Sequence, residues 1–147
     1  MNIKDIFQQF IDNNKLMQLA TQDNGKLWVC NLYFAGDDNG NIYWTSNRKR
    51  RHSVEIESNP EVAVTIVNDV DKKQAIQISG KAFRLSVEDS DKVHEIYGAK
   101  FGQKDSRLEE VRKDTSDSRA YWVLKPEYIE LWDEVNFPDK PKQQVEL

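Results

Sequence analysis

Strand-like runs separated by turn signals fill most of this chain, and they restrict it to a mainly antiparallel β fold. The first residues depart from this pattern. Apolar residues between Ile3 and Ile11 recur at helical spacing, and Asp12-Asn13-Asn14 ends that helix. Strands are then expected at residues 15–21, 27–35, 41–46, 62–67, 74–85, 121–125 and 128–132. Further helices are expected at 52–58 and from Ser86 to about Phe101, while 103–118 reads as surface helix or loop.

The order of these strands predicts a small barrel of six or seven strands with peripheral helices. The first three strands are joined by turns rich in Asp, Asn and Gly, and they are expected to form an antiparallel meander. Residues 62–67 are apolar on both faces, which predicts a strand buried on both sides of a barrel wall. Gly80 inside the long strand 74–85 predicts a bulge or bend.

Composition limits the classes of protein that this chain can belong to. Its 147 residues suit one domain, expected at 1–133, followed by an unstructured tail at 134–147. The hydrophobic content of 38% is low for a self-sufficient globule, so a second subunit or a ligand is expected to cover part of the surface. A net charge of -4 argues against general nucleic-acid binding. The sequence shows neither a signal peptide nor a membrane-length apolar stretch, so a soluble cytoplasmic protein is expected.

Residues 48–52, hereafter the basic turn, read Arg-Lys-Arg-Arg-His and join an expected strand to an expected helix. Cations at a helix N-terminus are unfavourable in isolation, so an anion should offset them. Thr45, Ser46 and Asn47 add donors just upstream, and together with the helix start they suit a bound phosphate. A solvated turn or a nucleic-acid contact are the alternative interpretations.

Four segments, in this order, resemble the flavin-binding split-barrel family, the pyridoxamine 5'-phosphate oxidase-like superfamily that includes general stress proteins. The first is Leu19-Ala20-Thr21 with its following turn. The second runs from Tyr43-Trp44-Thr45-Ser46 through Arg51-His52-Ser53 and Asn59-Pro60 to Val62-Ala63-Val64. The third is Gln77-Ile78-Ser79-Gly80-Lys81-Ala82, and the fourth is Pro126-Glu127-Tyr128-Ile129-Glu130-Leu131-Trp132. The resemblance implies a split β-barrel over most of the domain.

The resemblance also implies FMN bound at a homodimer interface. In the family pattern Thr45 and Ser46 lie beside the flavin phosphate, Arg51 binds it, and His52 stands where Lys is usual. The remaining implied cofactor contacts are Asn31, Leu32, Trp44, Gln77 and Trp132. From the residues alone, Asn31 and Gln77 can equally face solvent, and Trp132 can be a plain core aromatic.

Departures from the family bear on catalysis. The segment 134–139 is acidic and lacks arginine where true pyridoxamine phosphate oxidases have basic residues, so pyridoxal-phosphate synthesis is not expected. His52 and His94 are the only histidines and Cys30 is the only thiol. Their spacing is not that of a metal site, and no catalytic residue can be assigned from the sequence. Two functions remain: an FMN-dependent oxidoreductase acting on an unidentified small molecule, or a stress-related protein that binds flavin or another phosphate ligand without turnover.

Overall fold

The computed structural model describes residues 2–147. Helix α1 (Ile3–Asn13) begins at Asn2, whose side chain accepts a hydrogen bond from the Asp5 amide at 3.0 Å. One face of α1 carries the residues that recur at helical spacing in the sequence. These residues are buried, and they pack into the main core: Ile6, Phe7, Phe10 and Ile11. The helix expected at the N-terminus is thereby confirmed.

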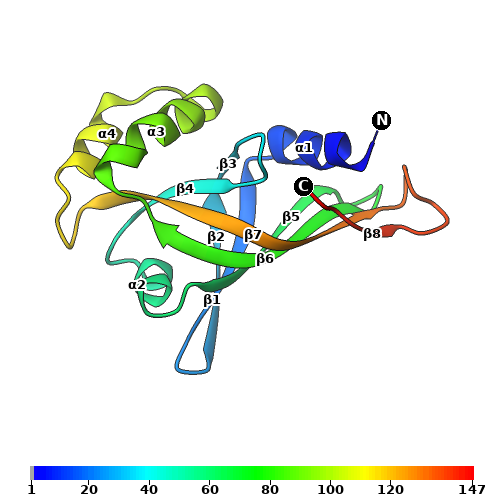
Figure 1. The fold of residues 1–147 in the computed structure, drawn as a ribbon, viewed down its shortest axis with the longest axis horizontal. Coiled ribbons are helices and arrows are strands. Elements are labelled where there is room, and N and C mark those ends of the chain that lie inside the picture. The colour runs from blue at the N-terminus through cyan, green and yellow to red at the C-terminus, as the bar shows by residue number, and fades with distance from the viewer. Residues whose placement is uncertain (1) are drawn as a thin grey trace.

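The sheet is antiparallel throughout and curls around the core as a split barrel (Figure 1). Its strand order is β2-β1-β5-β6-β7-β4-β3, and β8 pairs with β7. The strands are β1 (Leu16–Asp23), β2 (Lys26–Tyr33), β3 (Ala35–Gly36), β4 (Ile42–Asn47), β5 (Glu61–Asp69), β6 (Gln74–Arg84), β7 (Arg119–Asp133) and β8 (Lys142–Gln144). The mainly β fold class expected from the sequence is confirmed.

The first three expected strands do not form a simple meander. β2 pairs with β1 only, whereas β4 pairs with β3 and β7. The ladder breaks at Phe34, whose side chain is fully buried in the core and whose amide donates to the carbonyl of Lys15. Burial of that ring therefore directs the chain from the β1–β2 hairpin to the other side of the barrel.

The strand expected at 62–67 is one-sided in this chain. In β5 the side chains of Val62, Val64 and Ile66 are buried, while Ala63 and Val67 are exposed on the outer face. The prediction of burial on both sides is wrong for the single chain, because no helix within residues 2–147 covers this face. An apolar outer face is left open.

Gly80 lies at the predicted bulge. The β6–β7 register shifts between Ser79 and Gly80, and a Cβ at Gly80 would lie 2.2 Å from the carbonyl oxygen of Lys125. Pro126 is the partner of Gly80 at this irregular point, where its missing N–H does not interrupt the ladder. The two strands expected at 121–125 and 128–132 are consequently one continuous strand, β7.

Three further helices lie outside the sheet. Helix α2 (Arg51–Ser58) follows the basic turn, and α3 (Val87–Phe101) begins at Ser86, whose hydroxyl accepts from the Asp89 amide. Helix α4 (Asp105–Arg112) forms within the charged segment 103–118 and pairs with α3 beside one end of the sheet (Figure 1). Among residues 2–147, the four helices are all too short or too polar to cross a membrane.

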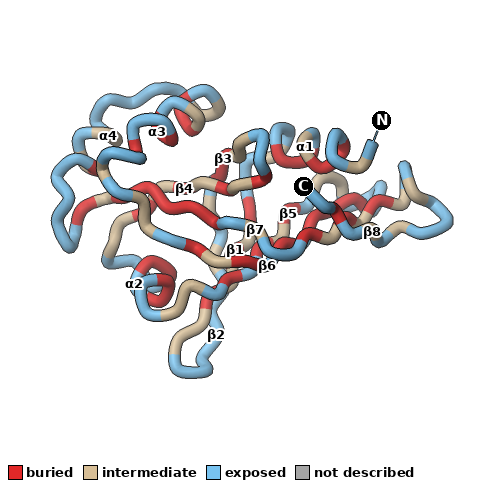
Figure 2. The backbone as a smooth tube through the Cα atoms, in the orientation of Figure 1, coloured by how far each residue is buried: buried red, intermediate tan, exposed pale blue. Residues whose placement is uncertain are grey.

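The segment 134–147 is ordered, contrary to the unstructured tail expected from its composition. Asp133 is fully buried and its carboxylate accepts the amides of Val135 and Asn136, which fixes the turn after β7. β8 then pairs back onto β7, and Val145 is buried in the main core. Figure 2 shows buried positions concentrated along the central strands and the inner face of α1.

Candidate functional site

Carboxylates of the chain itself offset part of the charge of the basic turn. Arg48 donates from Nη1 to the carbonyl oxygen of Thr115 at 2.9 Å and lies 3.6 Å from the Asp114 carboxylate. The Lys49 ammonium lies 4.0 Å from Asp117. These partners come from the loop before β7, which β4–β7 pairing holds beside the turn. The anion required by the cationic helix start is therefore supplied in part from within the protein.

Arg51 is held between an aromatic ring and a carboxylate. Its guanidinium lies 4.3 Å from the centroid of the Trp28 ring, and its Nε donates to Oε2 of Glu55 at 3.1 Å. Oε1 of Glu55 accepts from the Thr21 hydroxyl at 2.8 Å. Burial by itself would raise the pKa of Glu55, but the bonds from Thr21 and Arg51 outweigh it and lower that pKa. Glu55 is thus a buried, ionised carboxylate.

Trp44, Ser46 and His52 face the interior. His52 Nε2 lies 2.8 Å from the Ser46 hydroxyl, and the carbonyl of Ser46 accepts from Trp122 Nε1. Burial, with the nearby charge of Arg50, lowers the pKa of His52 and favours a neutral ring. Trp44 is fully buried and its indole N–H has no partner among residues 2–147. These three predicted cofactor contacts are buried in this structure.

Three other predicted residues, Asn31, Leu32 and Thr45, line one cleft of about 470 Å³. We call it the arginine cleft, because Arg107 and Arg119 complete it together with Tyr33, Tyr97, Lys104, Ser106 and Glu110. It lies where β2 and β4 meet the α3–α4 pair. The Thr45 hydroxyl donates to the carbonyl of Ala120 at 3.1 Å and accepts from Arg119 Nη1 at 3.5 Å. Three of the residues that the sequence resemblance implies as cofactor contacts therefore line a single cleft.

The charge of the arginine cleft is mainly positive. Among residues 2–147, Lys104, Arg107 and Arg119 form no ion pair, whereas the cleft's carboxylate, Glu110, binds Lys113 at 2.6 Å. The Arg107 guanidinium lies 4.8 Å from the Tyr97 ring centroid, so it is held over an aromatic face. One guanidinium held over an aromatic ring and a second one without an ion pair suit a ligand that joins a planar ring to an anionic group.

Gln77 and Trp132 do not line this cleft. Gln77 is exposed on the outer face of β6, where it lines a hollow of about 320 Å³ with Ala20, Val29 and Tyr128. Trp132 is partly buried on β7 between Ala75 of β6 and Lys142 of β8. Within one chain, the predicted cofactor residues are consequently divided among the cleft, the core, the basic turn and the outer face.

Sequence reasoning missed Arg107, Arg119 and Lys104. Arg107 and Lys104 belong to the charged segment 103–118, where no local pattern separates a ligand-facing cation from a solvated one. Arg119 begins β7 and reaches Thr45 through strand pairing. Within residues 2–147, the structure brings together no group of three His, Cys, Asp or Glu residues that could hold a metal ion.

Comparison with solved structures shows the same fold. The chain is 17% identical to general stress protein 26 from Bacillus anthracis str. Sterne, covers all of both chains and superposes with a TM-score of 0.69. It is 21% identical to HutZ, a heme storage protein from Vibrio cholerae, with 86% of this chain and 92% of that chain covered and a TM-score of 0.70. It is 16% identical to Atu2129, a protein of unknown function from Agrobacterium tumefaciens str. C58, over 87% of this chain but only 55% of that one, with a TM-score of 0.72.

Comparison with curated proteins gave no match. A family profile, in contrast, covers nearly the whole chain. The profile described as pyridoxamine 5'-phosphate oxidase matches residues 3–133, which run from the first turn of α1 to the end of β7. This agrees with the resemblance in the four sequence segments and with the split barrel. The chain therefore belongs to the pyridoxamine 5'-phosphate oxidase family.

Proposed function

We propose that this protein binds FMN in the arginine cleft and acts as a flavin-dependent oxidoreductase on a small molecule. The observation that supports this best is the convergence of Asn31, Leu32 and Thr45 on a cleft that also holds two unpaired arginines. FMN joins a planar ring to a phosphate, which is the kind of ligand that such a cleft suits. When bound, the flavin supplies the redox chemistry, and the protein binds and orients it.

The residues of the cleft have distinct roles in this proposal. Arg107 and Arg119 hold the phosphate through charge-assisted hydrogen bonds, because neither is committed to a carboxylate within residues 2–147. Asn31 and Leu32 lie along the ring edge, and Tyr97 supports Arg107 from behind. Arg51, the phosphate ligand implied by the sequence resemblance, would have to share its guanidinium between the phosphate and Glu55.

The fold is also found in a protein described as heme storage protein, so haem is a competing ligand. Protein-bound haem commonly takes a histidine as axial ligand. Both histidines here are buried and engaged: His52 with Ser46 at 2.8 Å and His94 with the Tyr121 hydroxyl at 2.7 Å. Either would have to leave its partner to reach a ligand in the cleft. This observation favours flavin over haem.

The open outer face supports a homodimer. Ala63, Val67, Val29 and Tyr128 lie exposed on or beside the hollow that Gln77 lines. An apolar strand face of this kind is normally covered in solution. We propose that a second copy of the chain covers it, which would also place Gln77 at the interface between the subunits.

The alternative is a non-catalytic flavin or phosphate-ligand binding protein, since the carboxylate that lines the cleft, Glu110, is already paired with Lys113 at 2.6 Å. The visible absorption spectrum of the protein titrated with FMN tests binding, and oxidation of reduced nicotinamide by the flavin-loaded protein tests turnover. Binding with turnover is the expected result. Binding without turnover would favour the alternative, and no FMN binding would overturn FMN as the ligand in both.

A further inference from the structure

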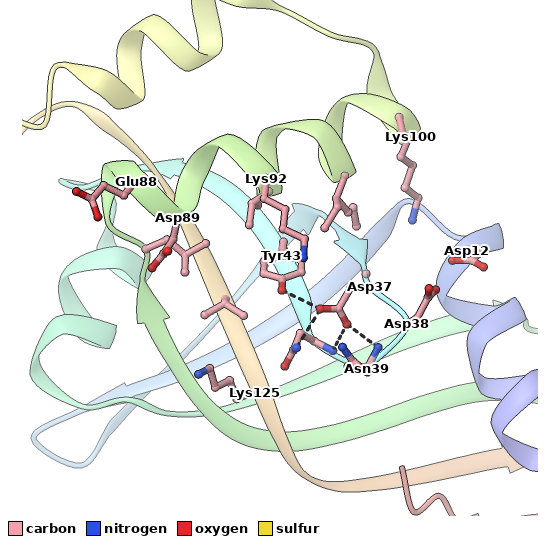
Figure 3. A pocket seen from close by; sticks show the side chains of 18 residues that line it. Asp12, Asp37, Asp38, Asn39, Tyr43, Glu88, Asp89, Lys92, Lys100 and Lys125 are labelled. Carbon is pink, nitrogen blue, oxygen red and sulfur yellow. Dashed lines mark hydrogen bonds between the residues drawn. The ribbon is translucent and has the colours of Figure 1, made fainter.

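Helix α3 carries a buried histidine that has no role in the proposed flavin binding. His94 is 5% exposed, and its Nδ1 lies 2.7 Å from the hydroxyl oxygen of Tyr121 on β7. Other residues of the same helix, Lys92, Val93 and Ile96, line a separate cavity of about 920 Å³ (Figure 3). His94 is not among the residues that line that cavity, and its ring contacts β7 instead.

Packed aromatic rings connect His94 to the arginine cleft. The ring centroids of His94 and Tyr121 are 5.9 Å apart, and those of Tyr121 and Tyr97 are also 5.9 Å apart. Tyr97 lines the cleft together with Arg107 and Arg119, and the Arg107 guanidinium lies 4.8 Å from the Tyr97 ring centroid. Both tyrosines are buried. A charge in this part of the cleft therefore acts on His94 through packed rings, which screen it less than bulk water does.

The charge of Arg107 disfavours a protonated His94. Burial lowers the pKa of His94, and the positive charge of Arg107 lowers that pKa further, while Asp105 opposes Arg107. Arg112 and Asp91 also act on His94, with opposite signs, and they are paired with each other at 3.1 Å. An anion that neutralised Arg107 would consequently remove the largest of these repulsions.

The tyrosines around His94 remain neutral at the pH values where histidine titrates. Burial and the bond that its hydroxyl donates to Asp37 raise the pKa of Tyr43 on β4 to about 12, and that bond is drawn in Figure 3. Burial also raises the pKa values of Tyr97 and Tyr121. β3, which consists of residues 35–36, contributes no titratable side chain. His94 is thus the group of this cluster that can gain a proton near pH 6 to 7, a range set by the ordinary pKa of histidine at about 6.5.

The bond between His94 and Tyr121 can exist in both protonation states of the ring. Nδ1 of a neutral ring can accept from the Tyr121 hydroxyl, whereas Nδ1 of a charged ring donates to the hydroxyl oxygen. Because a hydroxyl group can serve as donor or acceptor, protonation of His94 does not require the pair to separate.

We propose that binding of an anion in the arginine cleft is coupled to uptake of a proton by His94. By reciprocity, the affinity of the cleft for an anion rises as the pH falls through the range in which His94 titrates. This inference rests on the proposed function in one respect, since both place an anionic group beside Arg107. For a bound flavin, that group is the phosphate, so the coupling would favour release of the flavin at higher pH.

Calorimetric titration of the full chain with 2-naphthalenesulfonate tests this coupling. The probe joins a planar ring to an anion that stays fully charged at each pH used, so it exchanges no proton of its own. Titrations at about pH 6 in two buffers with different enthalpies of ionisation measure the protons taken up per bound probe. We expect net uptake, and an affinity roughly three- to tenfold higher at about pH 5.5 than at about pH 7.5.

Two histidine variants identify the group that takes up the proton. His94→Gln should abolish proton uptake and most of the pH dependence, because the amide can still hydrogen-bond Tyr121 but does not titrate. His52→Gln is the matched control, since it removes the other histidine, which contacts Ser46 and does not line the cleft. It should leave the proton uptake unchanged.

A measurement without ligand tests the charge that carries the coupling. Arg107→Gln should raise the pKa of His94, followed through the imidazole signals in NMR spectra, and should weaken binding of the sulfonate. Arg84→Gln removes a guanidinium that is paired with Glu57, and it should leave the pKa of His94 unchanged.

The coupling would be overturned by proton uptake that persists in His94→Gln, by its loss in His52→Gln, or by an unchanged pKa of His94 in Arg107→Gln. It would also be overturned by the absence of sulfonate binding at millimolar concentration. Because these titrations contain no flavin, they separate the two proposals. Proton-linked sulfonate binding without FMN binding would overturn only FMN as the ligand, whereas FMN binding with sulfonate binding that takes up no proton would overturn only the coupling.

Discussion

The Arg51 guanidinium and the Glu55 carboxylate are paired at 3.1 Å across one turn of α2, with the Trp28 ring against the other side of the guanidinium. The pair joins α2 to the β1–β2 hairpin, because Glu55 also accepts from Thr21 of β1. Glu55 is buried, whereas Arg51 is half exposed. Glu55 therefore has a structural role between α2 and β1, and one side of Arg51 remains accessible.

Replacing Glu55 with Gln should destabilise the fold. The substitution removes the carboxylate charge that faces Arg51 and replaces one of two acceptor oxygens with an amide donor, so the bonds from Arg51 and Thr21 cannot both be kept as they are, a cost of about 1–3 kcal/mol. Urea unfolding followed by tryptophan fluorescence measures it. Glu57→Gln is the matched control, because Glu57 lies on the same helix in an exposed pair with Arg84 and should cost at most about 1 kcal/mol. Equal losses in the two variants would contradict a structural role for Glu55.

The second prediction concerns the phosphate of FMN. Arg119→Ala should weaken FMN binding by roughly ten- to a hundredfold, because a charge-assisted hydrogen bond is worth about 1.5–3 kcal/mol. Riboflavin, which lacks the phosphate, should bind Arg119→Ala and the original chain about equally. Arg48→Ala should change little, since Arg48 already contacts Asp114 and Thr115. Fluorescence titration of both flavins measures these affinities.

Arg51→Ala distinguishes the two possible phosphate sites. If the basic turn holds the phosphate, as the sequence resemblance implies, Arg51→Ala will weaken FMN binding more than Arg119→Ala does. Our proposal expects the reverse order. A matching loss for riboflavin in either variant would place that arginine away from the phosphate.

The third prediction is that the protein loses stability as the pH falls through the ordinary range of histidine. Burial lowers the pKa of His52, and the same cause lowers that of His94. Below about pH 6.5 the unfolded chain therefore binds more protons than the folded chain, so the free energy of unfolding decreases. Urea unfolding at about pH 7.5 and about pH 5.5 should show this decrease.

The variant His52→Gln tests the contribution of one ring. The amide that replaces the imidazole can still hydrogen-bond Ser46 but does not titrate, so the change in stability between the two pH values should become smaller. The remainder should come from His94, because the lowered pKa of Glu55 places the effect of that carboxylate at more acidic pH. An unchanged pH dependence would mean that His52 titrates alike in both states.

The fourth prediction concerns the open outer face. Ala63→Arg should convert the proposed dimer into a monomer, because it places a charge at the centre of an apolar strand face. Val70→Arg is the control, since Val70 is exposed in the β5–β6 turn, off that face. Sedimentation velocity measures the state of each. A monomeric original chain that binds FMN tightly would contradict the dimer.

Local pattern was enough to predict most of the elements but not all of their pairings. Helical spacing of apolar residues identified α1, and Gly80 identified the bulge in β6. The end of β2 could not be predicted, because the strand-like alternation of side chains between two faces continues through residues 27–35. Phe34 turns inward because of contacts with core residues that are distant in sequence. Burial of Phe34 is a property of the assembled barrel.

The candidate site shows the same limit. The basic turn stands out in the sequence, but β4–β7 pairing brings Asp114 and Asp117 beside it and offsets its charge. Arg107 and Arg119 do not stand out in the sequence, because what distinguishes them, the lack of a carboxylate partner among the described residues, is seen only in three dimensions. The charged residues can be read from the sequence, whereas the fold determines which of them lie beside a residue of opposite charge.

The last prediction tests the ordered C-terminal segment with two valines. Val145 is buried in the main core after β8, whereas Val135 is exposed in the turn after β7. Val145→Ala should lower the free energy of unfolding by about 1–3 kcal/mol, from lost burial and a small cavity. Val135→Ala removes the same atoms from an exposed site and should change the free energy of unfolding by no more than about 0.5 kcal/mol. Urea unfolding of both variants decides the point: equal small effects would mean that residues 134–147 detach from the barrel in solution, as their composition alone suggests.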